Sequence, residues 1–260
     1  MKHFFFLSRD PRFSALEKRL LFHKHSVSYT LPDFFLEHSV LFFPFSAKEG
    51  EILSCLEKIP VPVTVVVGKG GEALRLFCKK KKHTLLPVLE NKGYVQQNAV
   101  ATAEGFLSEC IAKTDVTLAD LTVLVIGYGN CGKAIAKLLF LCGSEVYIHS
   151  RQGSMNKAEE DGFSLFPNFS SRLSMFDCIV NTVPDAIFPP DFFSLCRDGS
   201  LFFQIASGLS GLTSETAKEN GVSFFPLPAL PARFSPVTEG DNLFAALDPV
   251  LHLSTPPERE

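Results

Sequence analysis

The chain has 260 residues, a formal net charge of −3 and a hydrophobic content of 46%. A charge this close to zero excludes the strong positive field of a general nucleic-acid-binding protein, and no uninterrupted apolar run is long enough to span a membrane. The seven cysteines form no C-x-x-C pair and no His/Cys cluster has metal-ligand spacing. This pattern predicts reduced thiols in a cytoplasmic protein that binds no metal.

The first hundred residues alternate short apolar or β-branched runs with a segment of helical periodicity. Strands are expected at 4–8, 26–31, 39–44, 63–67 and 85–88, and a helix at 12–23. Such alternation is typical of an α/β layer with a largely parallel sheet. Residues 1–97 are therefore predicted to form a small N-terminal α/β domain that binds substrate or a partner.

A second α/β unit follows a helix that is expected over 98–113. Strands are expected at Thr122–Ile126, Glu145–His149, Cys178–Asn181, Leu201–Gln204 and 223–225, and helices at 133–142, 190–196, 214–220 and 240–247. This order predicts a Rossmann-type, doubly wound parallel sheet, so the fold class is α/β with a second, smaller N-terminal α/β domain. Residues 98–260 are predicted to form the NAD(P)-binding domain, with its linking helix and a C-terminal return helix.

A glycine-rich turn joins the first strand of this unit to the following helix. It reads G-x-G-x-x-G and comprises Gly127, Tyr128, Gly129, Asn130, Cys131 and Gly132. The first glycine permits a tight turn, the second a close approach of diphosphate to the backbone, and the third close packing of helix and sheet. In this context the motif predicts a dinucleotide cofactor.

The end of the next strand indicates which dinucleotide is bound. NAD-specific sites place an acid there to bind the ribose hydroxyls, but positions 147–152 contain none. Ser150, Arg151 and Gln152 can instead bind a 2′-phosphate, which favours NADP(H) over NAD(H). Thr182, Val183 and Pro184 follow a later strand and are expected to border the ribose and nicotinamide.

Several segments match a known family in order. The segment NAVATAEG (98–105) is similar to N-S-V-P-T-A-E-G, and N-T-V-P (181–184) to N-T-I-P. Ala206, Ser207 and Gly211 match L-A-S-x-P-G-G, residues 227–240 fit A-P-G-L-P-G-x-x-A-P-x-T-A-G, and Asp10 with Arg12 fits G-G-D-x-R. On these motifs the chain resembles the A subunit of dipicolinate synthase from endospore-forming bacteria.

The resemblance implies oxidation of dihydrodipicolinate, formed from 4-hydroxytetrahydrodipicolinate, to dipicolinate in the mother cell of a sporulating bacterium, with NAD(P)+ as hydride acceptor. Together with the residues at 150–152, this predicts NADP as the cofactor, with NAD possible. It also implies that a flavoprotein-like B subunit is the partner, and two-domain dehydrogenases of this plan favour a homodimer. Glu104 and Ser207 are the implied catalytic residues. The implied substrate-binding residues are Arg12, Asn98, Thr102, Gly208 and Arg233.

The chain also departs from the family pattern. Gln204 replaces an acid, Ala101 a proline, and Ala229 and Ala232 replace glycines. The proline and a glycine expected after Ser207 are also replaced, because the sequence there is Gly208-Leu209-Ser210-Gly211. Two alternatives therefore stay open. One is a shikimate- or 2-hydroxyacid-type NAD(P) dehydrogenase, and the other is a non-catalytic subunit that binds a dinucleotide.

Overall fold

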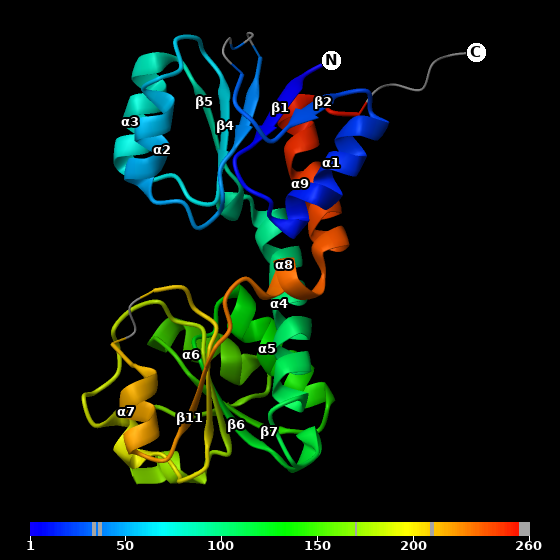
Figure 1. The fold of residues 1–260 in the computed structure, drawn as a ribbon. Coiled ribbons are helices and arrows are strands. Elements are labelled where there is room, and N and C mark those ends of the chain that lie inside the picture. Colours follow the sequence, from blue (N-terminus) through cyan, green and yellow to red (C-terminus); the bar gives the residue numbers. More distant parts are fainter. Residues whose placement is uncertain (33–34, 36–37, 170, 209–210, 255–260) are drawn as a thin grey trace. The chain divides into compact units, whose positions relative to one another are not determined.

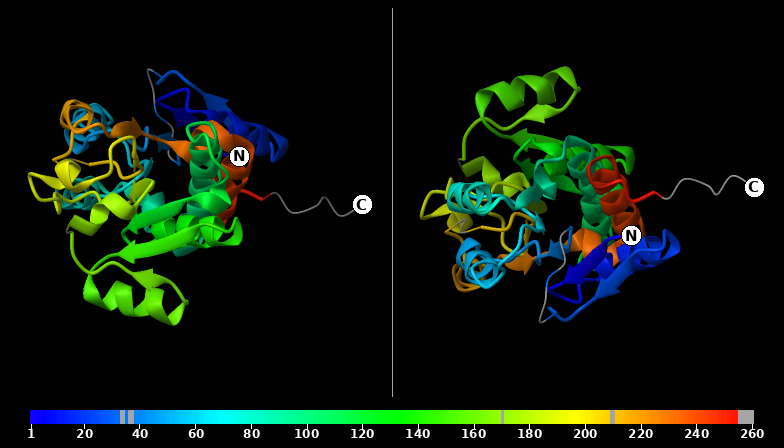
Figure 2. Two further views of the ribbon diagram at one scale, coloured as in Figure 1. Left: turned by 90° about the horizontal axis from the view of Figure 1, so that it is seen from below. Right: turned by 90° about the horizontal axis from the view of Figure 1, so that it is seen from above.

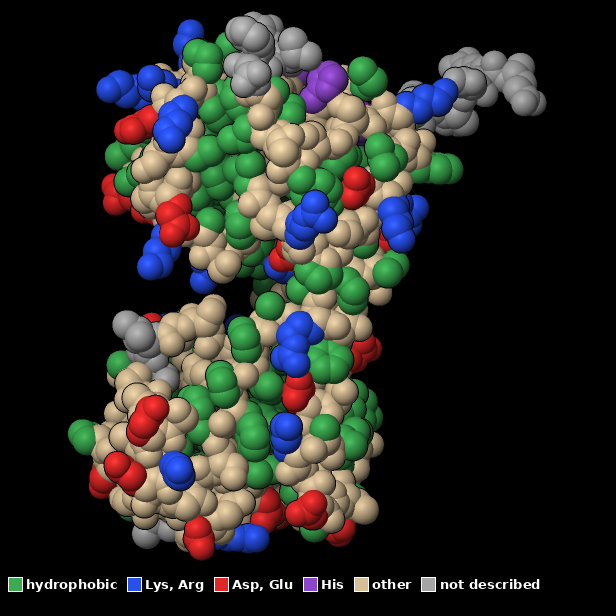
Figure 3. Space-filling view, viewed as in Figure 1, with side chains coloured by type: hydrophobic (Ala, Val, Ile, Leu, Met, Phe, Trp, Pro, Cys, Tyr) green, Lys and Arg blue, Asp and Glu red, His purple; other side chains and the backbone are tan. Residues whose placement is uncertain are grey.

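A computed structural model describes residues 1–32, 35, 38–169, 171–208 and 211–254 (Figure 1). The chain divides into two compact units, one formed by Met1–Asn98 with Ser235–Glu260 and the other by Ala99–Phe234. Within the described residues, no helix is long and apolar enough to cross a membrane. Side chains of both charge signs are interspersed on the face that Figure 3 shows.

The first unit is built on a five-stranded parallel sheet of order β2-β1-β3-β4-β5. Its strands are β1 (His3–Phe6), β2 (Ser26–Ser28), β3 (Val40–Phe42), β4 (Thr64–Val67) and β5 (Thr84–Pro87). Its helices are α1 (Pro11–Phe22), α2 (Glu49–Leu56), α3 (Glu72–Lys81) and α9 (Pro236–Leu251), with a 3-10 turn η1 (Val88–Glu90). The parallel sheet expected from the alternating apolar runs is confirmed.

The last helix differs from the expected domain division, because α9 packs within the first unit (Figure 2). Leu243 and Leu247 of α9 share a core with Phe13 of α1. Gly240 allows the approach, since a Cβ there would lie 2.5 Å from the Cβ of Ala15. The apolar stripes of α1 and α9 cover each other, and this long-range contact assigns residues 235–254 to the N-terminal unit rather than to the Rossmann unit.

The second unit contains a six-stranded parallel sheet of order β11-β10-β9-β6-β7-β8. Its strands are β6 (Thr122–Ile126), β7 (Glu145–His149), β8 (Ser164–Leu165), β9 (Cys178–Asn181), β10 (Leu201–Gln204) and β11 (Ser223–Pro226). The order reverses where β6 lies between β9 and β7, and such a switch point is where open α/β sheets bind ligands. The predicted Rossmann-type sheet is confirmed.

Helices cover both faces of this sheet. They are α4 (Lys92–Ile111), α5 (Asn130–Leu141), α6 (Gln152–Glu160), α7 (Ser214–Glu219) and α8 (Leu230–Phe234), with 3-10 turns η2 (Leu118–Asp120), η3 (Ser171–Met175) and η4 (Phe192–Leu195). One core contains Phe106 of α4 and Ile135 of α5, and the opposite core contains Phe192 of η4 and Ala217 of α7. The helix α4 begins in the first unit and enters the second at Ala99.

Candidate dinucleotide-binding site

Two glycines of the turn after β6 are required by close contacts, one with the loop after β9 and one within the turn. Gly127 has a φ of +96°, and a Cβ there would lie 2.4 Å from Oγ1 of Thr182. A Cβ on Gly132 would lie 2.0 Å from the carbonyl oxygen of Gly127. Gly132 therefore lets the start of α5 pack directly against the backbone of the turn. The motif predicted only that this glycine lets the helix pack close to the sheet.

Gly129 faces open space. It precedes α5 with a φ of −82°, and a Cβ built on it meets no atom within 4 Å. The helix begins at Asn130, so the amides of Asn130, Cys131 and Gly132 belong to its first turn and have no partner within the helix. These amides and the positive end of the helix fit a diphosphate.

Tyr128 of the turn and Lys133 of α5 both contact Asp161. The hydroxyl of Tyr128 donates to Oδ2 of Asp161 at 2.7 Å, and Nζ of Lys133 reaches the same oxygen at 2.6 Å. These hydrogen bonds, that of Lys133 first, lower the pKa of Asp161. Tyr128 is 6% exposed, so its side chain packs against protein and stabilises the turn.

Thr102, a predicted substrate-binding residue, is buried on α4 and contacts the turn. Its side chain hydrogen-bonds the thiol of Cys131. Burial raises the pKa of this thiol, and the hydrogen bond with Thr102 acts in the opposite direction. Thr102 thus links α4 to the start of α5, close to the candidate diphosphate site.

The residues proposed to select the dinucleotide lie together at the start of α6. Ser150 is half-buried, and Arg151 and Gln152 are exposed. The amide of Gln152 donates to Oδ1 of Asn156 at 2.9 Å. Arg151 forms no ion pair with any residue that the structure describes. Its charge is therefore available to an anion.

Two neighbouring loops leave the carboxyl ends of β9 and β10. Oγ1 of Thr182 donates to the carbonyl of Ile126 at 2.9 Å, which holds the first loop against β6. A Cβ on Gly208 would lie 2.6 Å from the carbonyl oxygen of Pro184, so the two loops are in contact. Ser207 is exposed in the second loop. The structure thus groups the predicted loop residues at the carboxyl edge of the sheet.

Both predicted substrate-binding arginines already have carboxylate partners. Nη2 of Arg12 lies 2.6 Å from Oδ2 of Asp10, and its Nε lies 2.9 Å from Oδ1. Burial by itself lowers the pKa of Arg12, but the hydrogen bonds and charge of Asp10 outweigh it and the pKa is raised. Nη2 of Arg233 contacts Oε1 of Glu109 in the second unit. Neither guanidinium is an unpaired cation.

Glu239, which no sequence pattern predicted as a functional residue, is fully buried at the start of α9. Its Oε2 accepts from the hydroxyl of Tyr94 at 2.9 Å and from the amide of Asn98 at 2.8 Å. Asn242 donates to its other oxygen at 3.2 Å. The signal that could have found it is the spacing of Tyr94 and Asn98, which places two donors on one face of a helix.

The predicted site residues are divided between the two units. Arg12 and Asn98 belong to the first unit, and Thr102, Glu104, Ser207, Gly208 and Arg233 to the second. Glu104 is exposed on α4. No group of three His, Cys, Asp or Glu side chains that could hold a metal is found in the described part of the chain.

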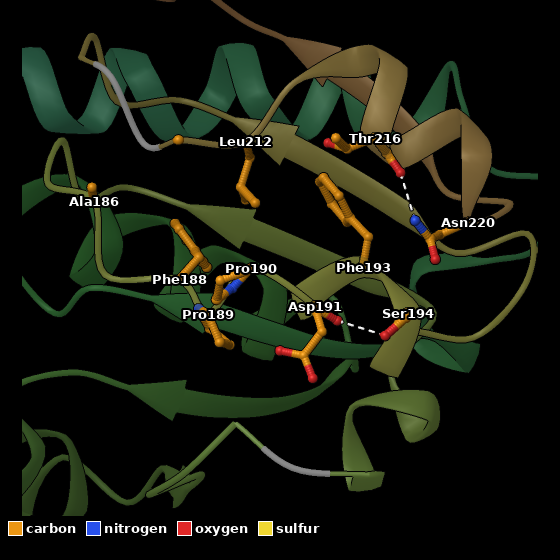
Figure 4. A pocket seen from close by; sticks show the side chains of 11 residues that line it. Ala186, Phe188, Pro189, Pro190, Asp191, Phe193, Ser194, Leu212, Thr216 and Asn220 are labelled. Atoms are coloured by element: carbon orange, nitrogen blue, oxygen red, sulfur yellow. Dashed lines mark hydrogen bonds between the residues drawn. The ribbon is translucent and has the colours of Figure 1, made fainter.

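One cavity of about 460 Å³ lies elsewhere in the second unit (Figure 4). Phe188 and Phe193 line it beside Leu212, and Asp191 lies at its edge. None of the predicted site residues lines this cavity. The candidate dinucleotide site is therefore defined by the turn, the start of α6 and the loops after β9 and β10.

Comparison with known proteins supports this assignment. Residues 92–210 match the family model of the D-isomer specific 2-hydroxyacid dehydrogenase, NAD binding domain. The chain is 26% identical over 200 residues to the A subunit of dipicolinate synthase from Bacillus subtilis, covering 75% of this chain and 67% of the relative. A 74-residue stretch, 28% of this chain and 22% of the relative, is 39% identical to ketol-acid reductoisomerase (NADP(+)) of Methanopyrus kandleri.

A solved structure shares the whole fold. The crystal structure of the A subunit of dipicolinate synthase from Bacillus halodurans aligns with a TM-score of 0.83 and 22% identity, covering 96% of this chain and 98% of that one. At this identity the structural match establishes the fold, and the sequence match to the Bacillus subtilis protein extends over most of the chain. The chain is a homologue of the A subunit of dipicolinate synthase, and its residues 92–210 are similar to the NAD-binding domain of D-isomer specific 2-hydroxyacid dehydrogenases.

Proposed function

We propose that this chain is the A subunit of a dipicolinate synthase. It uses NADP+ to oxidise dihydrodipicolinate, which arises from 4-hydroxytetrahydrodipicolinate, to dipicolinate. The observation that carries the proposal is the similarity to the Bacillus subtilis protein over 75% of the chain. The open space at Gly129, before the first turn of α5, supports the dinucleotide site that this reaction needs.

A bound dinucleotide would supply the hydride acceptor, and the chain's own residues bind and orient it. The amides of Asn130, Cys131 and Gly132 hold the diphosphate, and Thr182, Val183 and Pro184 border the ribose and nicotinamide. Arg151 binds the 2′-phosphate, assisted by Ser150 and Gln152. The name of the similar Methanopyrus kandleri enzyme includes NADP(+), which supports the same preference here.

Oxidation of the dihydropyridine ring removes one hydride and one proton. The exposed carboxylate of Glu104 takes the proton, and the hydroxyl of Ser207 donates to the substrate. Because the product ring is aromatic, alignment of substrate and dinucleotide is the main task of the protein. In the second unit, the substrate carboxylates bind Thr102, Gly208 and Arg233, and they must share the guanidinium group of Arg233 with Glu109. The roles of Arg12, which is paired with Asp10, and Asn98 in the first unit stay predictions.

The similarity to the Bacillus subtilis protein also supports the assembly that we propose. The chain works beside a flavoprotein-like B subunit, as a homodimer, in the cytoplasm of the mother cell of a sporulating bacterium. Dimer formation and binding of the B subunit are tested together. The purified chain is measured by light scattering alone and after mixing with the purified B subunit, and the mass of each species is determined. A chain that stays monomeric and does not bind the B subunit would contradict this assembly.

Two alternatives each have an observation in their favour. The family model over 92–210 favours a dehydrogenase of 2-hydroxy acids. Ala229 has a φ of +53°, a strained conformation for alanine, at a position where the family pattern has glycine. This departure favours a subunit that binds a dinucleotide without turnover.

A turnover assay separates the three functions. We expect the purified chain, with NADP+ and enzymatically generated cyclic substrate, to form dipicolinate, detected by its ultraviolet absorbance. The assay is run with and without the B subunit, and D-2-hydroxy acids and shikimate are offered in parallel. Oxidation of a hydroxy acid alone supports a dehydrogenase of another substrate. Binding of NADP+ without any turnover, even with the B subunit, supports the non-catalytic alternative.

A separate prediction follows from the proposed preference for NADP+ over NAD+. Replacing Arg151 by glutamate is expected to weaken NADP+ binding by about 100-fold, because a charge-assisted contact is replaced by repulsion, and to change NAD+ binding by less than about threefold. The measurement is isothermal titration of each dinucleotide. Lys157→Glu is the matched control, because it makes the same charge change in the last turn of α6. Equal losses for both dinucleotides in Arg151→Glu would contradict the assigned preference.

A further inference from the structure

Two buried amide side chains link the ends of neighbouring strands in the second unit. Asn181 ends β9 and is fully buried, and Gln204 ends β10 and is 9% exposed. Nδ2 of Asn181 donates to Oε1 of Gln204 at 2.9 Å, and Nε2 of Gln204 donates to the carbonyl of Ala206 at 2.9 Å. Asn181 also accepts from the N–H of Val183 at 2.9 Å and donates to its carbonyl at 3.0 Å. This amide pair therefore holds both loops that follow the strands.

The backbone partners determine the orientation of each amide. The N–H of Val183 can only donate, so it requires the oxygen of Asn181. The carbonyl of Ala206 can only accept, so it requires the nitrogen of Gln204. The nitrogen of Asn181 is then left to meet the oxygen of Gln204, and every contact of the pair is complementary.

The same contacts set the direction of two loop peptides. In a trans peptide the carbonyl and the N–H point in opposite directions, and the described residues contain no cis peptide. Because the N–H of Val183 points toward the amide pair, the carbonyl of Thr182 points away from it. Because the carbonyl of Ala206 points toward the pair, the N–H of Ser207 points away, at an exposed residue.

We propose that the amide pair positions the nicotinamide end of the dinucleotide by directing the Thr182 carbonyl and the Ser207 N–H outward. An acceptor and a donor on adjacent loops complement a primary carboxamide, whose nitrogen donates and whose oxygen accepts. The two loops are adjacent because a Cβ on Gly208 would lie only 2.6 Å from the carbonyl of Pro184. The inference rests on the proposed function, since it requires a nicotinamide dinucleotide at the start of α5.

Replacing Gln204 by glutamate separates positioning from packing. An ionised carboxyl at this position can accept from Asn181 but cannot donate to Ala206, whereas the protonated form can do both. The hydrogen-bond partners of Gln204 are uncharged, and burial favours the neutral form. We expect Gln204→Glu to bind NADP+ about tenfold more weakly than the unmodified chain at about pH 8.5, and within about twofold of it at about pH 5.5.

The experiment titrates two ligands calorimetrically at both pH values. One is NADP+, and the other is 2′-phospho-ADP-ribose, which has no nicotinamide. Asn181→Asp is the second variant, because its ionised form also loses a donor and the same pH dependence is expected. Gln97→Glu, at an exposed position of α4, controls for the added charge. Thermal unfolding of each variant checks that it is folded.

The two ligands distinguish the inference from the function on which it rests. Support is a pH-dependent loss of NADP+ affinity in Gln204→Glu and Asn181→Asp, with 2′-phospho-ADP-ribose affinity unchanged. Equal losses for both ligands, or no loss for NADP+, would overturn the positioning role while leaving the dinucleotide site intact. If the unmodified chain binds neither ligand, the proposed function fails and this inference fails with it.

Discussion

Replacing Gly129 by alanine is expected to abolish dinucleotide binding while leaving the chain folded. A Cβ at this position meets no protein atom within 4 Å and the φ of −82° suits alanine, so the free energy of unfolding should change by no more than about 1 kcal/mol. The methyl group would occupy the space into which the first amides of α5 point. We expect the affinity for NADP+ to fall by about 100-fold or more, because the diphosphate can no longer approach those amides.

Two other glycines provide the controls for this prediction. Gly132→Ala places a Cβ 2.0 Å from the carbonyl oxygen of Gly127, so it should lose both binding and stability. Gly50→Ala, on α2 of the first unit, meets no atom within 4 Å and should keep both. Calorimetric titration with NADP+ and thermal unfolding measure the two quantities. Unchanged NADP+ affinity in Gly129→Ala would contradict the diphosphate site.

Replacing Glu239 by alanine is expected to lower the free energy of unfolding of the first unit by about 3 kcal/mol. The carboxylate accepts from the buried hydroxyl of Tyr94 and the half-buried amide of Asn98, and its removal leaves both donors without that acceptor. It also removes the contact between α9 and the start of α4. Tyr94→Phe deletes only one donor and should cost less, about 1 kcal/mol.

Urea unfolding followed by circular dichroism measures this effect. Glu57→Ala is the control, because Glu57 is exposed in the same unit, and it should change the free energy of unfolding by less than about 0.5 kcal/mol. NADP+ binding is measured alongside, since the residues assigned to the dinucleotide all lie in the second unit. If Glu239→Ala lowers the free energy of unfolding by no more than Glu57→Ala does, the contacts of the buried Glu239 carboxylate contribute little to stability.

The sequence by itself determined the α/β class and the central strands of the nucleotide unit. Thr122–Ile126, Glu145–His149, Cys178–Asn181 and Leu201–Gln204 were predicted with the bounds that the structure has. Parallel strands buried on both faces are continuous apolar runs, so local sequence marks them clearly. Helix starts were less well predicted, because α4 begins at Lys92 and α5 at Asn130, where polar residues and glycines carry little apolar periodicity.

The sequence also determined the glycine turn and the absence of an acid after β7, because both are short-range patterns with a direct physical meaning. Only the tertiary structure decided that α9 belongs to the first unit and that Arg12 and Arg233 have carboxylate partners. Only it showed that Glu239, which stands at an alanine position of the family pattern, is buried against α4. A charged residue can be buried only if partners from other segments satisfy it, and those long-range contacts leave no periodic signal in the chain.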